Sequence, residues 1–96
     1  METEKILGML GLARRAGKAI LGLDNIKKFK GQAIIIVLAS DSSDRTKRKI
    51  NEMEKHVIDI GRTKLELGHL LGVGEVSAVA VTDINFAAKI KELEKL

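Results

Sequence analysis

The sequence predicts an α/β domain in which a four-stranded sheet is covered by helices on both faces. Five helix-like and four strand-like segments alternate along the 96 residues, separated by glycine or polar residues. The run Ala33–Ala39 is continuous and β-branched, which is typical of a central strand buried on both faces. A chain of this length has no room for a second core, so we expect one domain over residues 1–96.

The first helix is expected over residues 4–16, where apolar residues recur at helical spacing. Its apolar stripe comprises Ile6, Leu7, Leu10 and Ala13, widened by Met9 and Leu12. Gly17 follows two arginines and ends the helix. Residues 19–21 predict a very short strand.

Gly22 predicts a turn into a second helix, which Asp24 or Asn25 caps and which runs to about Lys30. Beyond the central strand, the polar residues 40–44 offer several caps for a third helix over about 44–55. A second core strand is expected over residues 57–60.

Thr63 and Glu66 have the spacing of a capping box, which predicts the start of a fourth helix. This helix carries Leu67, Leu70 and Leu71, and ends at Gly72. A third core strand is expected over residues 77–81. Asp83 then caps a final helix with Phe86, Ile90 and Leu93 on one face.

Positive charge is concentrated in the first half of the chain. The net charge is +4, and residues 1–48 hold ten basic against five acidic residues, whereas residues 49–96 hold seven against eight. A clustered basic surface on a small domain is the electrostatic footprint of a nucleic-acid binder, although it also occurs on ordinary solvated surfaces.

Composition excludes several classes of function. The chain has no cysteine, which excludes disulfides and thiolate chemistry and fits a reducing compartment. The only aromatic residues are Phe29 and Phe86, too few for a module that stacks bases on its strands. No apolar run approaches the roughly 20 residues of a membrane span, and no signal peptide is visible. We therefore expect a cytoplasmic protein that does not contact membranes.

Two carboxylates follow predicted core strands and form an alternative site. Asp41 and Asp83 could together serve a phosphoacceptor or a metal-dependent phosphatase, but both also fit as caps of the helices that follow them. His56 and His69 lack the spacing of a metal site, and no glycine motif matches a nucleotide-binding loop. We expect no metal and no cofactor.

The segment from Arg14 to Lys28 places basic residues around the turn at Gly22 that opens a helix. Lys18, Lys27 and Lys28 would add positive charge where a helix start can receive phosphate. The short polar side chains of Asp24 and Asn25 are able to contact base edges.

An ordered series of short motifs runs through nearly the whole chain. The motifs are Arg14-Arg15-Ala16-Gly17-Lys18, Gly22, Gly31-Gln32-Ala33, Leu38-Ala39-Ser40-Asp41, Thr46-Lys47-Arg48-Lys49, Leu67-Gly68, Gly72-Val73 and Ala80-Val81-Thr82-Asp83 with Phe86-Ala87. The series resembles the ribosomal-protein superfamily of the L-seven-Ae and L-thirty-e type, in particular its bacterial YlxQ-type branch. The resemblance implies a three-layer α-β-α sandwich with a mixed sheet that binds kink-turn RNA, a helix bent at a bulge beside tandem sheared G·A pairs.

By this resemblance, the loop that opens the second helix enters the widened RNA groove, and the loop before the last strand covers a flipped-out nucleotide. The RNA-binding residues that it implies, together with the basic residues noted above, are Lys18, Gly22, Leu23, Asp24, Asn25, Lys27, Lys28, Ser40, Asp41, Val73, Gly74, Glu75 and Val76. The archaeal loop reads Gly-x-Asn-Glu, so the amide and the acid are exchanged here. The stretch from Gly22 to Gly31 is also shorter than in the family, which predicts a clipped second helix.

The leading hypothesis is a non-enzymatic, monomeric RNA-binding protein of ribosomal-protein type, with kink-turn RNA or the ribosome as its partner. The carboxylate pair Asp41 and Asp83 supports the alternative of a small α/β phosphoacceptor or phosphatase. A protein-interaction module with a basic face is the third possibility.

Overall fold

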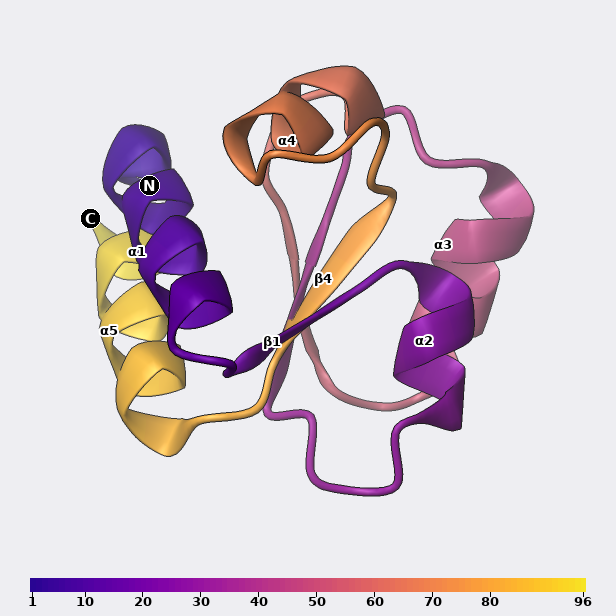
Figure 1. Ribbon diagram of the computed structural model, residues 1–96, viewed down its shortest axis with the longest axis horizontal. Coiled ribbons are helices and arrows are strands. Elements are labelled where there is room, and N and C mark those ends of the chain that lie inside the picture. Colours follow the sequence, from indigo (N-terminus) through magenta and orange to yellow (C-terminus); the bar gives the residue numbers. More distant parts are fainter.

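The computed structural model describes residues 1–96 and contains the predicted alternation of five helices and four strands (Figure 1). The elements are α1 (Thr3–Arg15), β1 (Ala19–Leu21), α2 (Leu23–Lys28), β2 (Ile35–Leu38), α3 (Asp44–Asn51), β3 (His56–Asp59), α4 (Lys64–Leu70), β4 (Ala78–Val81) and α5 (Ile84–Lys95). No helix is long and apolar enough to cross a membrane.

The four strands form one mixed sheet in the order β1-β4-β2-β3. Strand β4 lies between β1 and β2 and is antiparallel to both, whereas β2 and β3 are parallel. Val79 of β4 is therefore aligned with Leu21 on one side and with Val37 on the other. The mixed sheet that the resemblance implied is confirmed.

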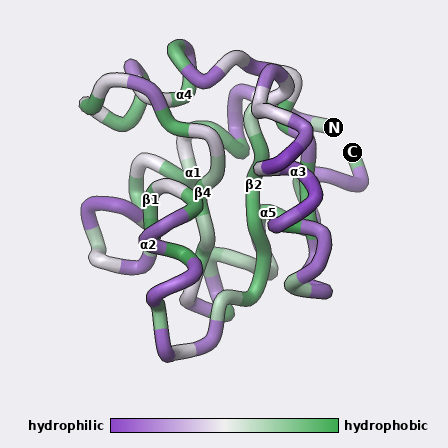
Figure 2. The backbone as a smooth tube through the Cα atoms, turned by 90° about the vertical axis from the view of Figure 1, so that its right-hand side faces the viewer, coloured by the Kyte–Doolittle hydropathy of each residue, from purple (hydrophilic) through white to green (hydrophobic).

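Helices cover both faces of the sheet, which gives the α-β-α sandwich. Figure 1 shows α1 and α5 side by side on one face, α2 and α3 on the other, and α4 across one end. In β2, Ile35 and Val37 pack into the core shared with α1, α4 and α5, while Ile36 and Leu38 pack towards α2 and α3. The prediction of a central strand buried on both faces is confirmed, and Figure 2 shows β2 and β4 as hydrophobic segments inside a more polar outline.

Several predicted boundaries and inward-facing residues are wrong. The third helix ends at Asn51 instead of about residue 55, because the chain turns through Glu54 at a φ of 55°. Leu12 and Leu70 were expected on buried stripes, but both are exposed. They lie where neither neighbouring helix nor sheet covers the helix surface, so helical spacing alone did not distinguish them from core residues.

The helix starts follow the sequence signals in part. The capping box of Thr63 and Glu66 is present, and Asp83 accepts a hydrogen bond from the amide of Phe86 at 3.0 Å. The expected cap of α2 is wrong, because Gly22 occupies that position. Asp41 does not cap α3 either, since Ser43 does so.

The contact between α4 and the loop before β4 permits no side chain at position 68. A Cβ there would lie 2.0 Å from the carbonyl oxygen of Gly74. We expect Gly68→Ala to lower the free energy of unfolding by at least about 1–3 kcal/mol, as overpacking does. Gly8→Ala is the matched control, because nothing lies near its Cβ and alanine in a helix gains about 0.5–1 kcal/mol over glycine. Urea unfolding measures the free energy of unfolding of both variants. A Gly68→Ala variant as stable as the Gly8→Ala variant would contradict the close contact.

Candidate nucleic-acid interface

Three of the segments singled out in the sequence meet at one end of the sheet. We call residues 22–25, 40–41 and 72–76 together the loop cluster. The amide of Gly22 donates to Ala78 at 2.8 Å, and the amide of Ala39 donates to Ser77 at 2.8 Å. The start of β4 is thus held between the end of β1 and the end of β2, and the loops that follow these strands lie together.

The turn at Gly22 depends on glycine. Its φ of 88° and ψ of 147° belong to a region that residues with a Cβ rarely adopt. The turn starts a helix of only six residues, which confirms the predicted short second helix. Leu23 is 8% exposed and packs into the core under α2, so its side chain is not available to a ligand.

Asp24 and Asn25 are both exposed on the first turn of α2. The Asn25 side-chain amide donates to the carbonyl of Leu21 at 2.9 Å, which ties the helix start back to β1. This bond uses the Nδ2 group and orients the Oδ1 atom as an acceptor. Asp24 makes no hydrogen bond or ion pair within the chain, so two acceptor groups are presented side by side.

Ser40 and Asp41 hold the start of α4. A capping box satisfies the amides of Thr63 and Glu66 but not the two amides between them, of which the first is that of Lys64. The Asp41 carboxylate accepts a hydrogen bond from that amide at 2.7 Å. Ser40 donates to the carbonyl of Arg62 from its amide at 2.8 Å and from its hydroxyl at 3.2 Å.

Sequence reasoning missed Lys64, which connects two parts of the loop cluster. Its carbonyl accepts from Val76 at 3.1 Å, and its Nζ atom lies 3.8 Å from the Glu75 carboxylate. The only sequence signal was its position directly after the cap residue Thr63, where an unpaired amide must find an acceptor.

The loop before β4 presents one apolar side chain. Val73 is 38% exposed, whereas Val76 is 4% exposed and belongs to the main core. The expectation that both valines pack on a nucleotide is therefore wrong for Val76. Val76 packs in the core that also holds Val79 and Val81, while Val73, Gly74 and Glu75 remain at the surface.

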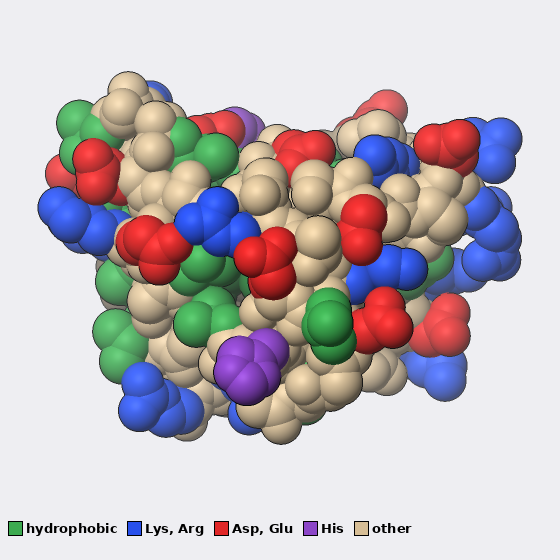
Figure 3. All heavy atoms as spheres, turned by 90° about the horizontal axis from the view of Figure 1, so that it is seen from above, with side chains coloured by type: hydrophobic (Ala, Val, Ile, Leu, Met, Phe, Trp, Pro, Cys, Tyr) green, Lys and Arg blue, Asp and Glu red, His purple; other side chains and the backbone are tan.

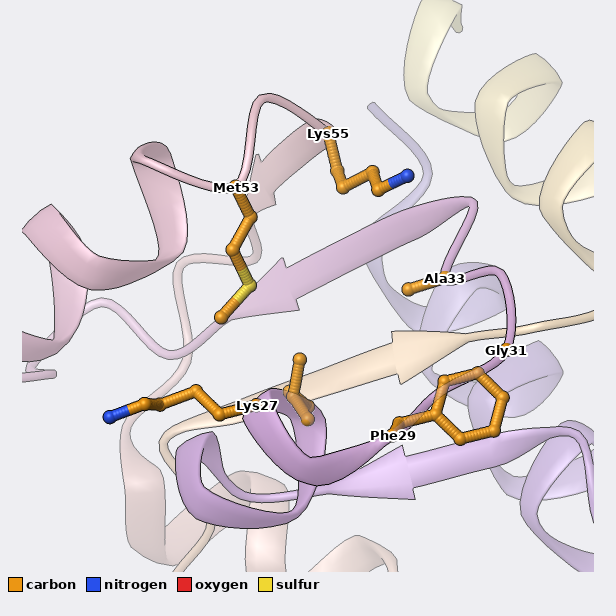
Figure 4. A pocket seen from close by; sticks show the side chains of 7 residues that line it. Lys27, Phe29, Gly31, Ala33, Met53 and Lys55 are labelled. Atoms are coloured by element: carbon orange, nitrogen blue, oxygen red, sulfur yellow. The ribbon is translucent and has the colours of Figure 1, made fainter.

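The three predicted phosphate-binding lysines lie in different places. Lys28 is exposed one helical turn after Asp24 and shares its side of α2. Lys27 lines a separate hollow of about 360 Å³ with Phe29 and Met53 (Figure 4). Lys18 precedes β1, so it lies at the opposite end of that strand from Gly22. Of the three, Lys28 shares the side of α2 that carries Asp24, whereas Lys18 lies at the other end of the sheet.

The surface at this end carries both signs of charge. Seen from above in Figure 3, acidic and basic side chains alternate over α4 and the neighbouring loops, and basic side chains gather at the edge formed by α3. The basic residues of α3 are Arg45, Lys47, Arg48 and Lys49. The arrangement offers acceptors and an apolar group at the centre, with cations around them.

The alternative site built from Asp41 and Asp83 is wrong. Asp41 follows β2 and Asp83 follows β4, and these strands are antiparallel. The two carboxylates therefore lie at opposite ends of the sheet. His56 pairs with Glu94 at 2.7 Å, and no group of three or more histidine, aspartate and glutamate residues is placed to hold a metal ion.

The Glu66 carboxylate stabilises α4 in its ionised form. The Thr63 amide donates to it at 2.9 Å, and this bond, aided by the Thr63 hydroxyl and by Arg62, lowers the pKa of Glu66. Because the pKa is lower in the folded state, the ionised carboxylate stabilises the fold at pH values above its ordinary pKa of 4.5. This stabilisation is lost as the pH falls through the pKa of the folded state. We expect Glu66→Gln to lose less stability than the wild type between neutral pH and about pH 3. The free energy of unfolding of both proteins is measured by urea unfolding at each pH. A difference between them that stays the same at every pH would contradict this linkage.

Comparisons with known proteins agree with the fold. No model of a known protein family matches the chain. The RNA-binding protein YlxQ of Enterococcus faecium is 30% identical over 98 aligned positions, which cover 94% of this chain and 91% of that protein. Among solved structures, a protein of unknown function from Bacillus halodurans C is similar with a TM-score of 0.83 and 30% identity, covering 96% of this chain and 98% of the other.

Proposed function

The chain belongs to the YlxQ family, and from that membership we propose that it is a non-enzymatic protein that binds structured RNA through the loop cluster. The observation that carries the proposal is the meeting of residues 22–25, 40–41 and 72–76 around the start of β4. These loops are held by backbone hydrogen bonds, so the surface is formed before a ligand arrives. Preformed shape favours recognition of a folded RNA over a flexible single strand.

We further propose that the ligand is a kink-turn, as in the L-seven-Ae and L-thirty-e superfamily, within a non-coding RNA such as ribosomal RNA. Asp24 and the Oδ1 atom of Asn25 are exposed acceptors on the first turn of α2. Sheared G·A pairs expose amino and imino groups of guanine in a widened groove, and acceptors of this kind bind them. Leu23 anchors the loop from below.

The apolar part of the interface is smaller than the sequence suggested. Val73 alone covers the unstacked nucleotide, because Val76 is in the core. A single exposed valine beside two glycine residues allows a base to lie close to the backbone of the loop. The contact with Gly68 fixes the position of Gly74 and so holds this loop in place.

Phosphate contacts come from cations at the margin of the loop cluster. Lys28 makes no ion pair within the chain and lies on the same side of α2 as Asp24. Contacts of this kind supply affinity without base selectivity, whereas Asp24 and Asn25 supply selectivity.

A gel shift tests the proposal directly. At a fixed and stated salt concentration, the protein is titrated against a kink-turn RNA and against the same RNA whose tandem G·A pairs are changed to Watson–Crick pairs. We expect strong preference for the intact kink-turn, because only the bent RNA fits the preformed loops. If about four to five phosphates are contacted, log K falls with log salt at a slope near −4.

Equal, salt-sensitive binding to both RNAs would contradict kink-turn recognition and leave another RNA as the target. No binding to either RNA would contradict the RNA proposal as a whole and favour a protein partner.

Two substitutions on α2 separate affinity from selectivity. Lys28→Ala is expected to weaken the binding of both RNAs equally and to flatten the slope of log K against log salt by about 1. Asn25→Ala is expected to remove about 1–3 kcal/mol of the preference for the intact kink-turn. Both are measured as dissociation constants for the two RNAs.

Lys95→Ala is the matched control for Lys28→Ala, because it removes the same charge from the exposed end of α5. If Lys28→Ala and Asn25→Ala both merely scale the two affinities, the first turn of α2 does not read the RNA.

A further inference from the structure

A groove beside the loop cluster is lined by two arginines for which the proposed function has no role. It has a volume of about 290 Å³ and lies between the last turn of α1 and the end of α4. Its lining residues are Gly11, Arg14, Arg15, Leu70, Leu71 and Gly72. We call it the arginine groove, and we infer that it binds a backbone phosphate of the RNA strand that leaves the loop cluster. This inference rests on the proposed function.

The charge of the groove is unopposed. Arg14 and Arg15 are both exposed, and neither forms an ion pair with any of the 13 acidic residues of the chain. No acidic residue lines the groove. The loop cluster beside it, in contrast, contains Asp24, Asp41 and Glu75. The cations that an RNA backbone requires are therefore placed next to the loops and not within them.

The shape of the groove suits a nucleotide linkage. Gly11 has no atom within 4 Å of the place where a Cβ would stand, so the α1 side is open. Leu71 is 3% exposed and forms the floor, while Leu70 is 44% exposed and forms an apolar rim. The volume of about 290 Å³ lies just below the roughly 300–1,000 Å³ of small-molecule sites, which fits one linkage rather than a large ligand. Guanidinium groups bind phosphate oxygens in a bidentate manner.

The groove continues into the loop cluster. Gly72 lines the groove, and the next residue is Val73, the exposed valine proposed to cover the unstacked nucleotide. The Val73 amide donates to Gly68 at 2.9 Å, so this junction is held against α4. A strand that places one base on Val73 has its neighbouring phosphate within reach of Arg14 and Arg15. Arg14 and Arg15 thus supply positive charge beside the loops. Lys18 does not, because it lies at the other end of β1.

The double variant Arg14→Gln and Arg15→Gln tests this inference. Both side chains are exposed, so the unfolding midpoint is expected to change little. With the intact kink-turn RNA, we expect affinity to fall about tenfold or more and the slope of log K against log salt to become flatter by about 2. The preference over the Watson–Crick RNA should persist, because phosphate contacts carry no base information.

The matched control is Lys91→Gln with Lys95→Gln, which removes the same charge from α5, an element that contributes nothing to the arginine groove. Unchanged affinity and slope in the arginine variant, or an equal loss in the lysine control, would overturn the inference while leaving kink-turn preference intact. A further outcome is a wild type that shows no preference between the RNAs while the arginine variant still has a flatter slope of log K against log salt. That result would support phosphate binding in the arginine groove and contradict kink-turn recognition. Absence of all RNA binding overturns both.

Discussion

The antiparallel placement of β4 between β1 and β2 is the constraint on which the rest of the structure depends. Because β4 starts where both neighbours end, the loop that enters it lies beside the loops that leave them. Backbone bonds from Gly22 and Ala39 hold that junction from both sides. One pairing choice therefore brings three distant parts of the chain to one surface and sends the loop after β4 to the other end.

Helix α4 contacts two of the loops that form this surface. Its capping box does not satisfy the Lys64 amide, which instead donates to Asp41 from another loop. Its interior glycine, Gly68, allows the backbone of Gly74 to approach. Hydrogen bonds from Lys64 to Asp41 and from Val76 to Lys64 thus connect the start of the helix with the loop after β2 and the loop before β4. Binding then requires little ordering of the protein, which favours affinity for a ligand of matching shape.

The distribution of charge separates two tasks. Acceptors and an exposed valine lie in the loop cluster, which is where we propose that the shape and the base edges of the RNA are recognised. Cations lie around it, on α2, on α3 and in the arginine groove. A central patch of positive charge would bind any nucleic acid, whereas this arrangement attracts a polyanion at its margins and tests its shape at the centre.

The sequence by itself determined the alternation of elements, the buried strand at Ile35–Leu38, the capping box at Thr63 and the glycine turn at Gly22. These features are local, because they depend on hydrophobic period, side-chain chemistry and backbone freedom within a few residues.

The tertiary structure alone decided that Val76 is buried, that Lys18 lies away from Gly22, and that Asp41 serves α4 instead of α3. It also separated Asp41 from Asp83 and placed two arginines of α1 beside the end of α4. The physical reason is strand direction and the packing that follows from it. Nothing in the local pattern of β4 states whether it runs with or against its neighbours, and that choice fixes which loops share an end of the sheet.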